Sequence, residues 1–192
     1  IAASTWNSGS DTLTSISDTL GNTYSRVGTV SGTTTGEVAY IYAAYNSSAG
    51  ANTISTAHTA PTGCLVRHLE FGGGPNSVLV DVVNTGSVNP GTPSVVLASC
   101  AANDLLFGYC ISDAPVTNGA GYVLDLQQNA FYSETTIYSL DSGSAGSKTV
   151  DWVNSVQAQF IAVSFKLTAG AAPSATLMSR QIFRINEFIV QA

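Results

Sequence analysis

A thiol, an imidazole and a carboxylate recur on one face of a single apolar segment. Cys64, His68 and Glu70 have the same parity, and residues two apart on a strand point to the same side. All three are zinc-ligand types. Same-face neighbours on one strand are about 7 Å apart, however, which is poor spacing for a tetrahedral site. A fourth ligand such as His58 would be required, and the sequence favours a buried thiol beside hydrogen-bonded polar groups.

Two carboxylates, Asp141 and Asp151, border a Gly/Ser-rich loop. Carboxylate, hydroxyl and carbonyl oxygens are the ligands that Ca²⁺ uses in proteins. The loop lacks the Asp-x-Asp-x-Asp-Gly pattern of a dedicated calcium site. A structural calcium ion is therefore an option here, and no cofactor is expected.

Residues for hydrolysis are present but unpaired. The chain has two histidines and no Gly-x-Ser-x-Gly elbow for a serine nucleophile. A glycosidase would need two carboxyl groups at a controlled separation. Glu70, Asp81, Asp125 and Glu134 are candidates, but no pattern pairs them. The sequence predicts a protein that is not an enzyme.

Large aromatic side chains offer a different chemistry, stacking on the apolar face of a sugar ring. The candidates for such a carbohydrate site are Trp6, Tyr45, Tyr122, Tyr132 and Trp152. The alternative is that these rings pack on sheet faces with their polar ends at the rim. The sequence does not separate exposed rings from buried ones.

The composition indicates the expected location of the protein and the classes of partner that it does not favour. Only 9% of the 192 residues are charged, the net charge is −6, and the polarity comes from 24 Ser and 21 Thr. The six basic residues are scattered, so no nucleic-acid partner is expected. No apolar run reaches the ~18 residues that a membrane-spanning helix requires. We expect an extracellular, cell-surface or virion protein whose weakly charged surface tolerates self-association.

The elements that must position these residues are strands. Residues 156–167 alternate and then become apolar on both faces, as in a strand in the middle of a packed sheet. Residues 37–45 likewise present two apolar faces, and no segment predicts an amphipathic helix. Short strands at turn spacings of 8–12 residues predict an all-β, two-sheet antiparallel β-sandwich, immunoglobulin-like or jelly-roll. Its domain covers residues 1–168, followed by a linker at 169–179 and a C-terminal strand at 180–192.

Three cysteines leave one unpaired if any disulfide forms. Cys100 and Cys110 are the plausible pair. If residues 103–104 form a two-residue hairpin turn, Cys100 faces Phe107 instead. Buried free thiols are the favoured alternative.

Several segments in order carry a family resemblance: residues 18–24, 42–46, 49–53, 69–72, 102–108, 120–122 and 160–165. Together they resemble the β-sandwich modules, mostly of unassigned function, of large bacterial secreted and surface proteins and of phage structural proteins. The resemblance covers roughly residues 11–166. It implies a non-catalytic extracellular sandwich, with Gly21 and Asn22 in a turn, Asp104 as a strand-entry cap and Glu70 near the core edge.

The chain departs from that family at both ends. Family members usually carry one or two strands before the segment matching residues 1–6, and they do not require the segment after Lys166. This last segment carries the apolar residues Ile182, Phe183, Ile185, Phe188 and Val190. It could fold back on its own sheet, pack locally as part of a fragment, or enter a neighbouring subunit as a donated strand.

The sequence therefore predicts a structural or adhesive module, such as a filament or virion subunit, that assembles through terminal strands. Its expected partners are copies of itself or other surface or virion proteins. The alternative is a carbohydrate-binding module, with glycans as partners.

Overall fold

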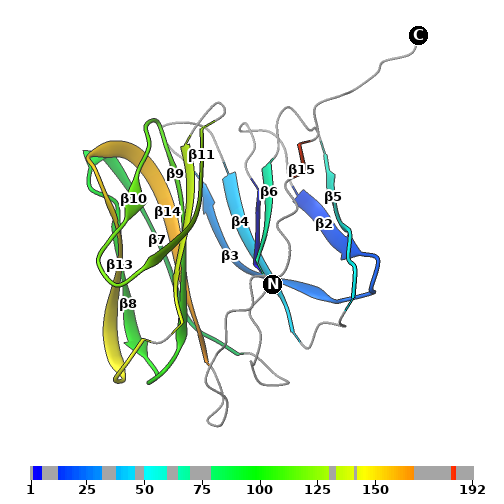
Figure 1. Ribbon diagram of the computed structural model, residues 1–192, viewed down its shortest axis with the longest axis horizontal. Helices are drawn as coiled ribbons and strands as arrows, with labels where there is room; N and C mark the ends of the chain where they lie inside the picture. The colour runs from blue at the N-terminus through cyan, green and yellow to red at the C-terminus, as the bar shows by residue number, and fades with distance from the viewer. Residues whose placement is uncertain are drawn as a thin grey trace.

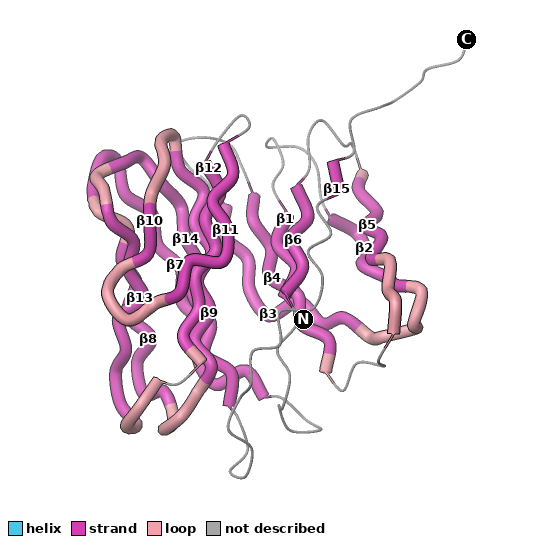
Figure 2. Tube along the Cα trace, viewed as in Figure 1, coloured by secondary structure: helices cyan, strands magenta, loops and turns pink. Residues whose placement is uncertain are grey.

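The computed structural model is a stack of β-sheets (Figures 1 and 2). It describes residues 2–5, 13–31, 38–45, 50–59, 65–69, 79–129, 133–140, 142–166 and 183–184. Within these ranges every regular element is a strand and all strand pairs are antiparallel. The all-β, sandwich-like fold predicted from the sequence is confirmed.

A five-stranded sheet forms the middle of the stack, in the order β11-β12-β9-β14-β7. Its strands are β7 (Leu79–Gly91), β9 (Leu105–Ser112), β11 (Val123–Asn129), β12 (Ser133–Ser139) and β14 (Val156–Lys166). β14 is hydrogen-bonded to β9 on one side and to β7 on the other. The interior strand expected at residues 156–167 is thus present.

Both faces of this central sheet are buried, and β14 shows why its sequence is apolar on both parities. Ile161, Val163 and Phe165 point into one apolar core. Phe160 and Ala162 point into a second core on the opposite side. A strand can be apolar at consecutive positions only where each face is covered, as here.

The first core is closed by a second five-stranded sheet, in the order β15-β6-β1-β4-β3. Its strands are β1 (Ala2–Thr5), β3 (Tyr24–Ser31), β4 (Val38–Ala44), β6 (Leu65–Leu69) and β15 (Phe183–Arg184). The segment at the start of the chain, β1, lies between β4 and β6 and pairs with both.

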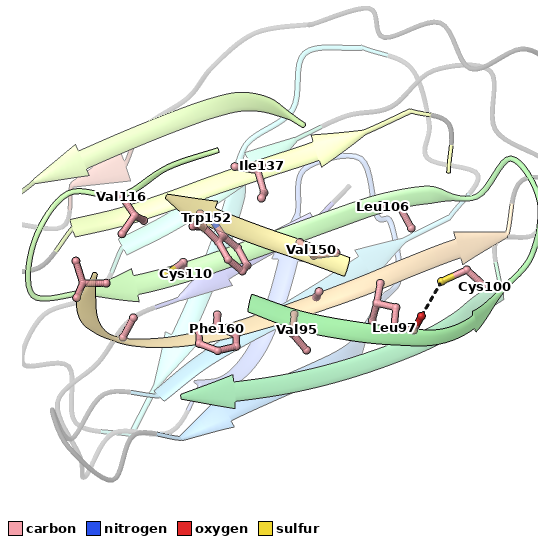
Figure 3. Close-up of a cluster of buried hydrophobic side chains, with 13 residues drawn as sticks. Val95, Leu97, Cys100, Leu106, Cys110, Val116, Ile137, Val150, Trp152 and Phe160 are labelled. Atoms are coloured by element: carbon pink, nitrogen blue, oxygen red, sulfur yellow. Dashed lines mark hydrogen bonds between the residues drawn. The ribbon is translucent and has the colours of Figure 1, made fainter. Parts of the chain in front are cut away.

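The second core is closed by a three-stranded sheet, in the order β10-β13-β8. Its strands are β8 (Ser94–Cys100), β10 (Thr117–Asn118) and β13 (Gly146–Val153). Trp152 of β13 packs on Phe160 of β14 across the two layers, with ring centroids 5.8 Å apart (Figure 3). This packing joins the outer sheet to the central one.

A fourth layer lies beyond β4, at the right of Figure 1. It is the pair β2 (Leu13–Asp18) and β5 (Ile54–His58). Leu13 packs with Tyr40 and Tyr42 of β4, while Ala39 and Ile41 of β4 face the first core. The two apolar faces predicted for residues 37–45 are therefore confirmed.

The number of layers exceeds the two that the sequence predicted. The reason is that β4 and β14 are each covered on both faces, so a sheet lies on either side of each. Alternation within one strand reports that a face is covered, but not by how many sheets the whole domain is built.

Residues 84–91 contain two Gly, two Asn and one Pro, yet β7 continues through them to Gly91 as a partner of β14. Residues 103–104 do not form a hairpin turn, because β8 and β9 belong to different sheets. Cys100 and Cys110 are buried and free, as the favoured alternative required; Cys64 lies outside the described residues.

Candidate functional site

The expected metal ligands are only partly within the described residues. Cys64, Glu70 and Asp141 lie outside them, and His68 is placed by its backbone alone, opposite Ala3 in register. Asp151 lies on β13 with its carboxylate against the Cα of Gly119. Across the described ranges, no three His, Cys, Asp or Glu residues are grouped so as to hold a metal ion.

The aromatic candidates have different surroundings. Trp152 was wrong as a sugar-stacking residue, because its side chain is completely buried in the core against Phe160. Tyr45 is half-buried against the first core. Trp6 and Tyr132 lie outside the described residues.

Tyr122 is half-buried, and its hydroxyl donates a hydrogen bond to the Thr149 carbonyl oxygen at 2.7 Å. Burial, with the nearby Asp151 carboxylate, raises the pKa of Tyr122 to about 12. The ring is therefore tied to β13 through its polar end.

The acidic candidates lie towards opposite edges of the central sheet. Asp125 on β11 accepts a hydrogen bond from the Thr136 hydroxyl at 3.0 Å, and Glu134 on β12 is buried. Asp81 lies on β7, at the opposite edge of the same sheet, and forms an ion pair with Lys166 at 2.8 Å. Asp81 therefore does not converge with the other two; Glu70 lies outside the described residues.

Asp18 organises the turn that links β2 to β3. Its Oδ1 accepts the backbone N–H groups of Leu20 and Asn22, at 3.1 and 2.9 Å. Its Oδ2 accepts the amide of Asn22, the hydroxyl of Tyr24 and the amide of Asn52, at 2.6, 2.7 and 2.8 Å. Desolvation raises the pKa of Asp18, but these hydrogen bonds outweigh it and hold the pKa well below its usual range. Gly21, at φ 72°, supplies the turn expected there.

The C-terminal segment adds a strand to the edge of β6. Phe183 pairs with Val66 and Arg184 with Leu65, in antiparallel register. The other apolar residues assigned to this segment, Ile182, Ile185, Phe188 and Val190, lie outside the described residues. In the part of the chain that is described, β6 is thus an edge that accepts an added strand.

The β7 edge of the central sheet, in contrast, carries features that oppose the addition of a strand. The side chain of Asn84 accepts the Thr85 N–H at 2.9 Å and donates to the Val96 carbonyl of β8 at 2.9 Å. Pro90 has no N–H to offer, and two register shifts interrupt the pairing of β7 with β14. Polar caps, proline and bulges are the devices by which proteins prevent strand addition at an edge. The Asn and Pro of residues 84–90 were the available signal in the sequence for such an edge.

Comparison with known protein families, with curated proteins and with solved structures finds no match to this chain. In the described part of the chain, no helix is long and apolar enough to cross a bilayer.

Proposed function

We propose that this chain is a non-catalytic structural or adhesive module of an extracellular or virion assembly, whose C-terminal segment joins copies by adding a strand to β6. The observation that supports this most is the antiparallel pairing of Phe183–Arg184 with the β6 edge. Main-chain hydrogen bonds provide the attraction in strand addition, and the side chains at alternate positions provide the specificity.

The pairing that β15 makes within one chain is equally available to the segment of a second copy. Exchanging an identical element between protomers preserves every contact, so it is a low-cost route to assembly. Sixteen residues separate Lys166 at the end of β14 from Phe183. Fully extended they span up to about 55 Å, enough to reach a neighbouring molecule.

The contrast between the two edges gives the assembly a direction. Asn84, Pro90 and the β7 bulges discourage addition at the central sheet. The β6 edge then receives the strand, and each copy offers one donor and one acceptor. Such a head-to-tail contact generates a ring if it closes and a filament if it does not.

The surface composition agrees with this role. Charged residues make up 9% of the chain while Ser and Thr together exceed a fifth of it, so electrostatic repulsion between copies is weak. A hydroxyl-rich surface of this kind suits a protein displayed outside a cell or on a particle.

The test is the molar mass of the intact chain, measured by size-exclusion chromatography with light scattering over a range of concentrations. Phe183→Asp, which places a charge in the added strand, and a chain ending at Ala169 are expected to be monomers. Ser179→Asp carries the same new charge outside β15 and is expected to assemble like the parent. Monomers for all four proteins at every concentration would contradict the proposal.

A further inference from the structure

Two carboxyl groups meet at the crossover from the outer sheet to the central sheet. Asp104 directly precedes β9 and is completely buried, and Asp81 projects from β7. The backbone N–H of Ala101 donates to the Oδ2 atoms of both, at 2.8 Å to Asp81 and 3.1 Å to Asp104. Two carboxyl groups that share one donor repel each other when both are charged, and a proton on one of them removes this repulsion.

A cation faces this pair. Lys166 Nζ lies 2.8 Å from Asp81 Oδ1, and its side chain is 47% exposed against 11% for Asp81. Asp104 Oδ1 is buried and finds no hydrogen-bond partner among the described residues. A negative charge is therefore better stabilised on Asp81, which has the Lys166 ammonium group, than on Asp104, which has only the Ala101 N–H that it shares with Asp81. The proton belongs on Asp104.

The electrostatics agree with this assignment. Desolvation first, and then Asp81, raise the pKa of Asp104 to about 6. The hydrogen bond from Lys166 lowers the pKa of Asp81. The other titratable groups around the pair are Cys100 at the end of β8, whose own pKa is raised by burial, and Lys148 of β13 beside that thiol.

The backbone beside the two carboxyl groups also holds the loop at Ser142 and Gly143 in place. Asn103 N–H donates to the Gly143 carbonyl, and Asp104 N–H donates to the Ser142 hydroxyl. Ser142 in turn donates its N–H to the Asp104 carbonyl and its hydroxyl to the Ala101 carbonyl. Residues 101–104 thus connect β7, β14 and the turn before β13 at one end of the second core.

We propose that Asp81 and Asp104 share one proton and act as a pH-sensitive lock, which fastens the 101–104 crossover in mildly acidic solution and loosens it at neutral pH. When the shared proton leaves, two carboxylates face each other. Asp81 has the ammonium group of Lys166 against it, whereas the carboxylate of Asp104 accepts only the Ala101 N–H among the described residues. The end of the core at Cys100 is then held less firmly.

The direction in pH follows from the two shifts. A carboxyl whose folded pKa is raised contributes stability below its unfolded pKa, and this is lost as the pH rises through the folded pKa. A carboxyl whose folded pKa is lowered contributes above its unfolded pKa, and this is lost on acidification. The pair therefore supports the fold best near pH 4, and the contribution of Asp104 is lost between about pH 4 and pH 6.

The test measures the melting temperature from pH 4 to pH 8 for the parent chain, Asp104→Asn and Asp113→Asn. Asparagine imitates the protonated carboxyl, so Asp104→Asn is expected to lose the decline between about pH 4 and pH 6, which for the parent is roughly 3–6 °C at this chain length. Asp113 is exposed, and Asp113→Asn removes one charge elsewhere and is expected to keep the parent's decline. The same profile for the parent and Asp104→Asn would overturn the proposal.

A second measurement applies even if Asp104→Asn does not fold. In the parent chain labelled with carbon-13 at aspartate carboxyl groups, Asp104 is expected to titrate with a midpoint near pH 6, well above the usual value for an aspartate. A midpoint for every aspartate at or below the usual value of about 4 would also overturn it.

Discussion

Replacing Gly108 with alanine tests how closely the outer sheet packs on the central one. Gly108 lies on β9, on the face that points into the second core. A Cβ atom built there would be 2.8 Å from Val150 Cγ1, 2.9 Å from Trp152 Cζ2 and 3.1 Å from Ile137 Cγ1. Ordinary carbon contacts are about 3.5–4.0 Å. The added methyl group therefore overlaps three side chains at once.

None of these neighbours can move aside easily. Val150, Trp152 and Ile137 are completely buried and belong to one core cluster (Figure 3). Inserting a methyl group into a well-packed core costs about 1–3 kcal/mol. For a chain of this length that lowers the melting temperature by roughly 2–4 °C for each kcal/mol.

The assay is urea unfolding followed by circular dichroism, with Val150→Ala and the double variant as partners. Val150→Ala alone removes two buried methyl groups and costs about 2–3 kcal/mol, transfer and cavity together. In the double variant the new methyl group occupies part of that space, so the two costs are less than additive by about 1 kcal/mol. If Gly108→Ala stays within about 0.5 kcal/mol of the parent, or the costs simply add, β13 does not pack on β9 as described.

Two further predictions concern polar side chains. Asn84→Ala removes the side chain that occupies the Thr85 N–H and the Val96 carbonyl. Light scattering is therefore expected to show self-association that Phe183→Asp does not suppress. A variant that behaves as the parent would mean that Asn84 does not prevent strand addition at the β7 edge. Asp18→Asn replaces a carboxylate that accepts five hydrogen bonds with a neutral amide. This is expected to lower the free energy of unfolding at pH 7 by about 1–2 kcal/mol. The value is kept low because the side chain is partly exposed to solvent. Because the folded pKa of Asp18 is lowered, the difference from the parent is expected to be full above about pH 4 and to shrink on further acidification; a difference that is independent of pH would refute the hydrogen-bond explanation.

Period-2 patterns predicted the strands with covered faces, and the same pattern could have corrected one site residue. Tyr40 and Tyr42 alternate with Ala39 and Ile41, and the structure buries both sets on opposite faces of β4. Trp152 has the parity of Val150, while Asp151 and Val153 point away from the core. Its burial was therefore readable from its neighbours, although its type alone suggested a binding ring.

The remaining features depend on contacts between distant segments. Residues 84–91 have poor strand propensity, and β14 overrides it by pairing with them. Asp81 and Asp104 come together because the chain crosses from β8 in the outer sheet to β9 in the central sheet. Their spacing in the sequence therefore does not predict the pair. The β7 edge is covered by the Asn84 side chain, whereas the β6 edge pairs with β15. The strand propensity of the residues in β6 and β7 does not predict this difference.

The most direct test of the central claim is a disulfide between two copies at the β6–β15 register. Val66 and Phe183 are Cα partners, and opposed residues in an antiparallel pair are about 4.5–5.5 Å apart, within the range of a disulfide. A Val66→Cys chain and a differently tagged Phe183→Cys chain are mixed, allowed to exchange and oxidised, with the parent plus Phe183→Cys as the control for the native thiols. Assembly by strand addition predicts a linked dimer carrying both tags, absent from the control. A chain carrying both Val66→Cys and Phe183→Cys that forms the disulfide within itself, with no link between the singly substituted chains, would contradict it.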